Sequence, residues 1–291
     1  MRIKFLGTSA AHSCPLPFCN CNVCDKARKS GGRNLRKRSS LLINEDLVID
    51  IGQDFMSASF MHGVDTTKIR YWLQTHSHSD HFSPAHIITR MSEYASKNIK
   101  PLSLFASSRC IQHMSEQLGQ EESGASLLEP KWLGRLNLEV TNVNIDKEFK
   151  CGPYSVTALH SAHDTNDDSY LYLVDDNSCK LFYGLDADEQ TLMRETIDYF
   201  SNNCIHLNVV VLDHTYGDIG SCDHLNTKQF IAVIGEMEKS GIVDKETKIF
   251  ASHISHEGVL SHDDFVLSAR QNGYDVAFDG LEIEINYIIT A

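Results

Sequence analysis

His76-Ser77-His78-Ser79-Asp80-His81 places four side chains that can bind a metal within six residues. The run follows the apolar segment Ile69-Arg70-Tyr71-Trp72-Leu73, whose β-branched and aromatic residues are typical of a strand. Imidazoles and carboxylates at this density are costly to bury, and like charges among them repel. Divalent cations offset that cost because nitrogen and oxygen donors bind them directly. The sequence therefore predicts a metal centre at the end of this strand.

The spacing within this run indicates more than one ion. An extended chain would direct His76, His78 and Asp80 to one side of the backbone. A turn that follows would bring Asp80 and His81 to a second point. This geometry suits two neighbouring metal ions.

The motif is the signature of the metallo-β-lactamase superfamily of dinuclear hydrolases, which the chain resembles. The resemblance implies three further ligands, each after a run that reads as a strand: His163, Asp186 and His253. It also implies how the set is divided. One ion would be held by His76, His78 and His163, the other by Asp80, His81 and His253, with Asp186 as the bridge.

Two of these positions have an alternative nearby. His160 lies three residues before His163, but His163 fits the spacing of the family better. Asp188 lies two residues after Asp186, and its place before Glu189 is typical of a helix N-cap.

A second cluster of metal-binding residues lies near the N-terminus, in Cys19-Asn20-Cys21-Asn22-Val23-Cys24. Thiolates at this spacing are typical of a zinc site, but tetrahedral structural zinc needs a fourth ligand. His256, three residues after His253, is the candidate. The arrangement resembles the PhnP-like cyclic phosphodiesterases of the carbon–phosphorus lyase pathway. This resemblance implies a Cys-rich zinc loop at residues 14–38, in which Cys14 is a competing ligand.

The same resemblance implies a phosphodiesterase that acts on small phosphodiesters, cyclic ones among them. Its cofactors would be one structural zinc and two active-site ions (Zn, Mn or Fe) that hold a hydroxide. Catalytic roles fall to Asp80 and to His224, the candidate general acid. Asp213 is expected to orient a ligand imidazole, and His214 is a candidate substrate contact.

Three other functions remain open. One is endonucleolytic processing of the tRNA 3′ end, for which the sequence shows no RNA-gripping arm. Another is a role like that of the pyrroloquinoline quinone biosynthesis protein of the same superfamily. The third is a non-catalytic module that binds zinc or docks a partner, although a scaffold has no need for seven inward-pointing ligands.

The charge balance favours a small phosphorylated substrate. The formal net charge is −13, which would repel a long nucleic acid. The densest basic segment, residues 26–38, reads as a solvated loop beside the zinc site. The acidic run 164–168 lies beside His163 and would disfavour a strongly negative substrate.

The whole chain, residues 1–291, is expected to form a single α/β domain, because no linker interrupts it and the ligands span positions 76 to 253. The resemblance implies a four-layer αβ/βα sandwich. Helices are expected at 85–94, 107–118, 189–200, 226–240 and 261–271, the last with a capping box between Ser261 and Asp264. No apolar run is long enough for a membrane span, and nine cysteines suit the reducing cytoplasm. A homodimer is compatible with the sequence.

Overall fold

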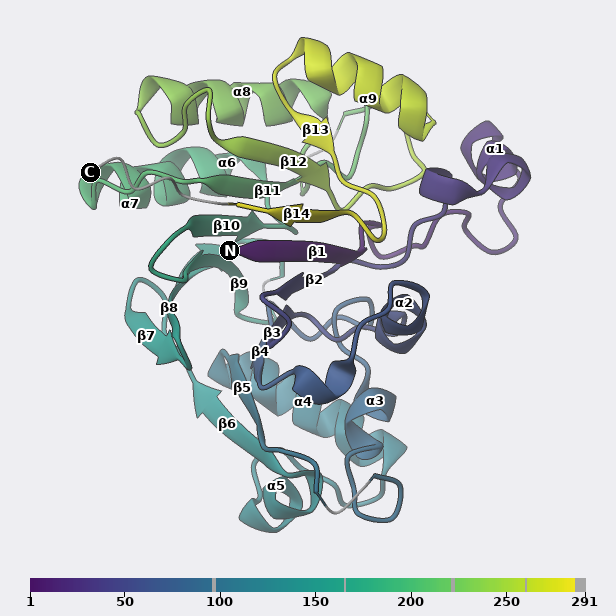
Figure 1. Cartoon of the computed structure of the whole chain (residues 1–291), viewed down its shortest axis with the longest axis vertical. Helices are drawn as coiled ribbons and strands as arrows, with labels where there is room; N and C mark the ends of the chain where they lie inside the picture. The colour runs from purple at the N-terminus through teal and green to yellow at the C-terminus, as the bar shows by residue number, and fades with distance from the viewer. Residues whose placement is uncertain (96–97, 165, 221–222, 260, 286–291) are drawn as a thin grey trace.

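Two β-sheets lie face to face in the computed structural model, with helices over both outer faces (Figure 1). The structure describes residues 1–95, 98–164, 166–220, 223–259 and 261–285. Within these residues each sheet contains seven strands.

The first sheet has the strand order β14-β1-β2-β3-β4-β5-β6. Pairing is antiparallel from β14 to β3 and parallel from β3 to β6. The strands are β1 (Arg2–Gly7), β2 (Ser40–Ile43), β3 (Leu47–Ile49), β4 (Tyr71–Leu73), β5 (Leu102–Ala106), β6 (Leu138–Asn142) and β14 (Glu282–Glu284).

The second sheet has the strand order β13-β12-β11-β10-β9-β8-β7. Strands β7 to β10 pair antiparallel, and β10 to β13 pair parallel. The strands are β7 (Glu148–Cys151), β8 (Tyr154–Ser161), β9 (Ser169–Asp175), β10 (Lys180–Gly184), β11 (Val209–Asp213), β12 (Lys248–Ser252) and β13 (Asp275–Val276).

Helices cover the outer face of each sheet. The first sheet carries α2 (Phe55–Met61), α3 (Pro84–Ile88), α4 (Ser108–Glu121) and α5 (Pro130–Leu136). The second carries α6 (Glu189–Thr191), the π-helical turn η3 (Leu192–Thr196), α7 (Ile197–Asn202), α8 (Thr227–Lys239) and α9 (His262–Gln271). The helix α1 (Asn22–Ser30) and the short 3₁₀ turns η1 (Gly32–Asn34) and η2 (Thr66–Lys68) lie in connections.

Three apolar cores account for the four layers. The core between the sheets contains alternate residues of strands from both, such as Ile3, Val156 and Val211. In β11 the remaining residues, Val210 and Leu212, face the helices instead. A strand with both faces buried needs a continuous apolar run, which is what the sequence shows there. The expected four-layer αβ/βα arrangement is confirmed.

Several expected elements differ in detail. The helix expected at 85–94 is only α3, and the helix expected at 189–200 is divided by the π-helical turn η3. The capping box expected at 261–264 is wrong: the hydroxyl of Ser261 donates to the Asp264 carboxylate and caps no backbone N–H. The described residues include no helix of the length and apolar composition required to cross a membrane.

Candidate metal centre

The predicted ligands gather at one edge of the sandwich because they follow the carboxyl ends of neighbouring strands. Strands β10, β11 and β12 run parallel, so the residues after them come to the same edge. Asp186 and His253 follow β10 and β12, and His163 follows β8. The His-rich loop follows β4 of the other sheet.

One group of imidazoles comprises His76, His78 and His163, with a nitrogen of each within 4.8 Å of the others. Nδ1 of His78 lies 3.4 Å from Nε2 of His163. His160 lies outside this group, because its Nδ1 is 2.8 Å from the Glu195 carboxylate and its side chain is 43% exposed. Of the two histidines weighed from the sequence, the structure brings His163 to the cluster.

A second group comprises Asp80, His81 and His253, again with donor atoms within 4.8 Å of one another. The Asp186 carboxylate lies between the two groups. Its oxygens are 2.9 Å from His81 Nε2, 3.2 Å from His253 Nε2 and 3.6 Å from His163 Nε2. Asp188 does not join them: it is the N-cap of α6, as expected, and accepts the N–H of Thr191.

Buried nitrogen and oxygen atoms crowd together in this cluster. The Nε2 atoms of His76, His81 and His253 and Oδ2 of Asp186 form no well-aligned hydrogen bond with any described residue. Nε2 of His81 and of His253 lie against the Asp186 carboxylate as ion pairs only. A buried polar atom without a hydrogen bond costs about 1–3 kcal/mol. Divalent metal ions would satisfy these atoms together, so the residues present fit the metals that the motif implies.

Charges around Asp186 support the same conclusion. Burial alone would raise the pKa of Asp186, but the imidazoles of His253 and His81 hold it well below its usual range. Burial would lower the pKa of His81, but the carboxylates of Asp80 and Asp186 raise it well above the ordinary value. The carboxylates of this cluster therefore favour positive charge beside them, which divalent metal ions would supply.

Asp50, which the sequence analysis did not identify, contacts the ring nitrogen of His81 that faces away from Asp186. Its carboxylate accepts from Nδ1 of His81 at 2.6 Å and from both the N–H and the hydroxyl of Thr75. Asp50 is fully buried and adopts a left-handed backbone with φ 62°, a conformation typical of functional sites when a non-glycine residue holds it. Asp186 and His253 share this feature, with φ 53° and 58°. The available signal was an aspartate directly after the apolar strand β3.

Asp213 and His224 form a second supporting pair. Nδ1 of His224 lies 2.9 Å from Oδ2 of Asp213, and the ring of His224 stacks on that of His253 at 5.4 Å. Burial alone would lower the pKa of His224, but the Asp213 carboxylate raises it to about 9. The Asp213 carboxylate therefore favours the protonated form of His224, which is the form that a proton donor needs.

One other expectation is corrected. His214 is no substrate contact, because it is fully buried among Phe230, Phe265 and Tyr274, and burial lowers its pKa to about 4.

In the acidic run 164–168, two carboxylates are engaged by the His-rich loop. Asp164 contacts Nε2 of His78 at 3.0 Å and leaves Nδ1 facing His163, and Asp167 accepts the N–H of Ser77.

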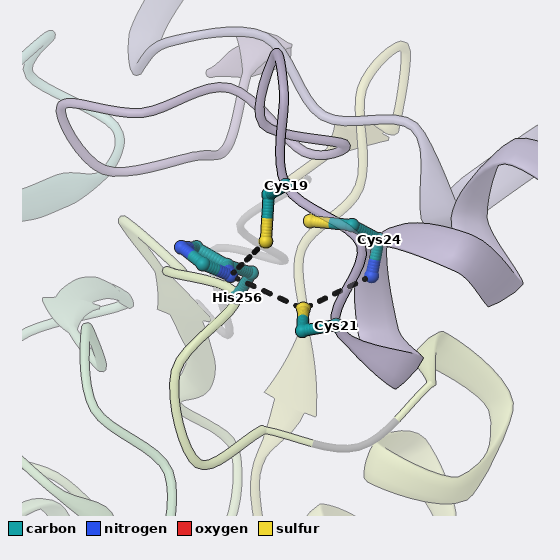
Figure 2. A group of neighbouring side chains, drawn as sticks. All are labelled: Cys19, Cys21, Cys24 and His256. Atoms are coloured by element: carbon teal, nitrogen blue, oxygen red, sulfur yellow. Dashed lines mark hydrogen bonds between the residues drawn. The ribbon is translucent and has the colours of Figure 1, made fainter.

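The thiol cluster lies apart from this centre, between the N-terminal loop and the segment after β12 (Figure 2). Sulfur atoms of Cys19 and Cys21 lie 3.7 and 3.4 Å from Nδ1 of His256, and the Cys24 sulfur completes a group within 4.8 Å. Burial alone would raise the pKa of the Cys21 thiol. Hydrogen bonds with the Cys24 N–H and with His256 favour the thiolate and lower this pKa to about 6. Three thiols and one imidazole fit tetrahedral zinc. Cys14 lies outside this group.

The basic segment 26–38 is less solvated than the sequence suggested. Arg36 is buried and donates to Thr8, to the Ala277 carbonyl and to His262, contacts that the sequence could not reveal because they come from distant parts of the chain. Other cations of the segment pair with carboxylates, among them Lys26 with Asp264. These pairings leave less of the segment for contacts with a polyanion.

Comparisons with known proteins agree with this geometry. The sequence model of the family described as anti-Pycsar protein Apyc1 matches residues 37–217, more than half of the chain. Comparison with curated protein sequences finds no match.

Among solved structures, a diphosphatase from the PhnP family is 19% identical over 98% of each chain, with a TM-score of 0.69. Zinc-bound PqqB from Methylobacterium extorquens is 16% identical over 98% of this chain and all of its own, with a TM-score of 0.68. The metallo-β-lactamase-fold protein YhfI from Bacillus subtilis is 16% identical over 97% of this chain and 98% of its own, with a TM-score of 0.63. These likenesses establish the metallo-β-lactamase sandwich for this chain.

Proposed function

The chain belongs to the anti-Pycsar protein Apyc1 family, and on that premise we propose that it is a metal-dependent phosphodiesterase acting on small phosphodiesters, cyclic ones included. We also propose that this chain has the anti-Pycsar role that the family's name describes. The observation that supports it best is the group of ligand-type nitrogen and oxygen atoms gathered at the strand ends, four of them buried without a well-aligned hydrogen bond.

Seven side chains would hold two ions: His76, His78, His163, Asp80, His81, His253 and Asp186, whose carboxylate lies between the two groups. When bound, two divalent ions lower the pKa of a bound water and polarise a phosphoryl oxygen. Cys19, Cys21, Cys24 and His256 would hold a structural zinc.

His224 would supply the proton that the leaving oxygen needs. Its Nδ1 is bonded to Asp213, so the proton to be donated is the one on Nε2. The ring stacks on His253 and lies 5.0 Å from that of His163, contacts that support this role. Asp213 fixes the orientation of His224 and favours its charged form.

Charge supports a small substrate over a long nucleic acid. The formal net charge is −13, and the cations of residues 26–38 are largely engaged within the chain. We further propose that residues 1–291 act as a single domain, because the shared core between the sheets includes residues of both. A cytoplasmic location is part of the proposal, since the described cysteines are free thiols.

Two histidines three residues apart provide a matched test of the metal centre. His163→Ala should abolish metal-dependent hydrolysis, because its imidazole faces His78 and Asp186. His160→Ala removes the same kind of side chain three residues earlier, near the end of β8. His160 contacts the Glu195 carboxylate and lies outside the ligand groups, so activity should remain within about 2-fold of wild type. Equal losses in both variants would remove His163 from the ligand set.

A substrate panel tests the reaction class. It should contain a linear phosphodiester, cyclic phosphates of a sugar and a nucleotide, a phosphomonoester, a lactone and a tRNA precursor. Hydrolysis of the diesters in preference to the monoester would support the proposal. Cleavage of the tRNA precursor alone would favour the endonuclease alternative. A metal-loaded protein that cleaves nothing would favour the biosynthetic or non-catalytic alternatives.

A further inference from the structure

Two buried threonines lie directly against imidazoles of the metal centre. Thr75 precedes His76, and its hydroxyl oxygen is 3.0 Å from Nδ1 of that ring. Thr215 follows β11, and its hydroxyl oxygen is 2.7 Å from Nδ1 of His253. Both threonines are almost fully buried. Neither has a part in the ligand set proposed above.

Each hydroxyl already donates its hydrogen to another group. The Thr75 hydroxyl donates to the Asp50 carboxylate, whose oxygens lie at 2.9 and 3.0 Å and can only accept. The Thr215 hydroxyl donates to the backbone oxygen of His253 at 2.9 Å. A hydroxyl has one hydrogen, so toward the imidazole each oxygen must accept.

This constraint determines which ring nitrogen carries hydrogen. A neutral imidazole has one N–H and one lone pair. If Nδ1 donates to the threonine, Nε2 keeps the lone pair. Nε2 of His76 and of His253 are buried and form no hydrogen bond with a described residue, and both rings belong to ligand groups that include Asp186. A metal ion needs that lone pair.

We propose that Thr75 and Thr215 are positioning residues that set the tautomer of His76 and His253, with hydrogen on Nδ1 and the lone pair on Nε2. The inference rests on the proposed metal centre. It adds to that centre a pair of hydroxyls, one from each sheet, in a role usually taken by carboxylates and backbone carbonyls.

The two sites differ in a way that gives the proposal a graded outcome. Asp213 Oδ2 lies 3.4 Å from Nδ1 of His253 and favours the same tautomer there. At His76 the hydroxyl of Thr75 is the hydrogen-bond partner of Nδ1. Loss of the Thr75 hydroxyl should therefore weaken metal binding more than loss of the Thr215 hydroxyl.

The test compares Thr75→Val, Thr75→Ser and Thr215→Val, with Thr247→Val as the matched control. Thr247 is also buried, and its hydroxyl both donates, to Leu207, and accepts, from Asp244. Zinc and manganese affinities of the full-length protein are measured by chelator competition. Thr75→Val should weaken binding about 10- to 100-fold, and Thr75→Ser should restore it to within about 3-fold. Thr247→Val should lower thermal stability and leave metal affinity unchanged.

A second measurement does not depend on any variant folding. Nitrogen NMR of the metal-free wild-type protein, labelled with ¹⁵N-histidine, reports the tautomer of each neutral ring. We expect hydrogen on Nδ1 of His76, and hydrogen on its Nε2 would overturn the proposal. A folded Thr75→Val protein with wild-type metal affinity would overturn it too. A wild-type protein that takes up no metal would instead defeat the proposed function.

Discussion

Replacing Gly52 by alanine tests how the His-rich loop is held against the segment after β3. An added Cβ at Gly52 would lie 1.9 Å from the backbone oxygen of Asp80 and 2.7 Å from its carbonyl carbon. Real Cβ atoms essentially never approach another atom closer than 3.0 Å, so the two segments must separate by at least about 1.1 Å. Both sides of the contact are main chain, and no side-chain rotation relieves it.

A separation of this size reaches the metal centre. Metal–ligand distances are held within about 0.2 Å, so a shift of Asp80 and His81 would spoil their coordination. The hydrogen bond from Ser83 N to Ile51 O, 2.9 Å long, lies beside the same contact. We expect Gly52→Ala to weaken metal affinity at least ~10-fold and to lower the free energy of unfolding by ~1–3 kcal/mol.

The assay is chelator competition on the full-length protein, with thermal unfolding in parallel. Gly235 in α8 is the matched control, because an added Cβ there meets nothing within 4 Å. Gly235→Ala should stabilise the helix by up to ~1 kcal/mol and leave metal affinity unchanged. A Gly52→Ala protein that binds metal as tightly as wild type would refute the reasoning.

Three further predictions concern the proton donor, its partner and the zinc loop. Burial alone would lower the pKa of His224, but Asp213 raises it to about 9. For substrates with poor leaving groups, kcat/KM should therefore fall as the pH rises through the pKa of His224, which bound metals would shift below 9. The rate with p-nitrophenyl esters should not change over the same pH range. Asp213→Asn should lower the pKa of His224 and so move this fall in kcat/KM to lower pH. An unchanged pH profile would show that Asp213 does not set the pKa of His224. Cys24→Ser and His256→Ala should each release zinc and lower Tm by several degrees, whereas His253→Ala should abolish hydrolysis with Tm near that of wild type. A His256→Ala protein that loses activity but keeps its zinc and Tm would reverse these assignments.

The resemblance to the metallo-β-lactamase superfamily allowed the ligands beyond the His-rich run to be selected, and His163, Asp186 and His253 each follow an apolar run that reads as a strand. Periodicity locates such strand ends, and the fold then brings them together. Asp50 follows the same pattern after β3, but nothing local distinguishes a buried supporting carboxylate from a turn residue. Its role depends on His81, 31 residues away in the chain.

Arg36 is a residue whose burial the sequence did not predict. A run of basic residues predicts a solvated loop, but the Arg36 guanidinium is buried and donates to partners as far along the chain as Ala277. The hydroxyls of Thr75 and Thr215 were invisible for a related reason. A hydroxyl gains a role only when its donor and acceptor partners are fixed in space, and those partners include Asp50, brought in from another strand.

Phosphorus NMR of a cyclic phosphodiester incubated with the metal-loaded protein tests the central claim most directly. The signal of the cyclic diester should be replaced by that of a phosphomonoester, and the conversion should stop when a chelator removes the metals and resume when they are restored. His163→Ala should leave the diester signal unchanged, while His160→Ala should convert it as wild type does. Conversion that continues unchanged in the exhaustively chelated protein, or a diester signal that persists with both ions bound, would contradict the account.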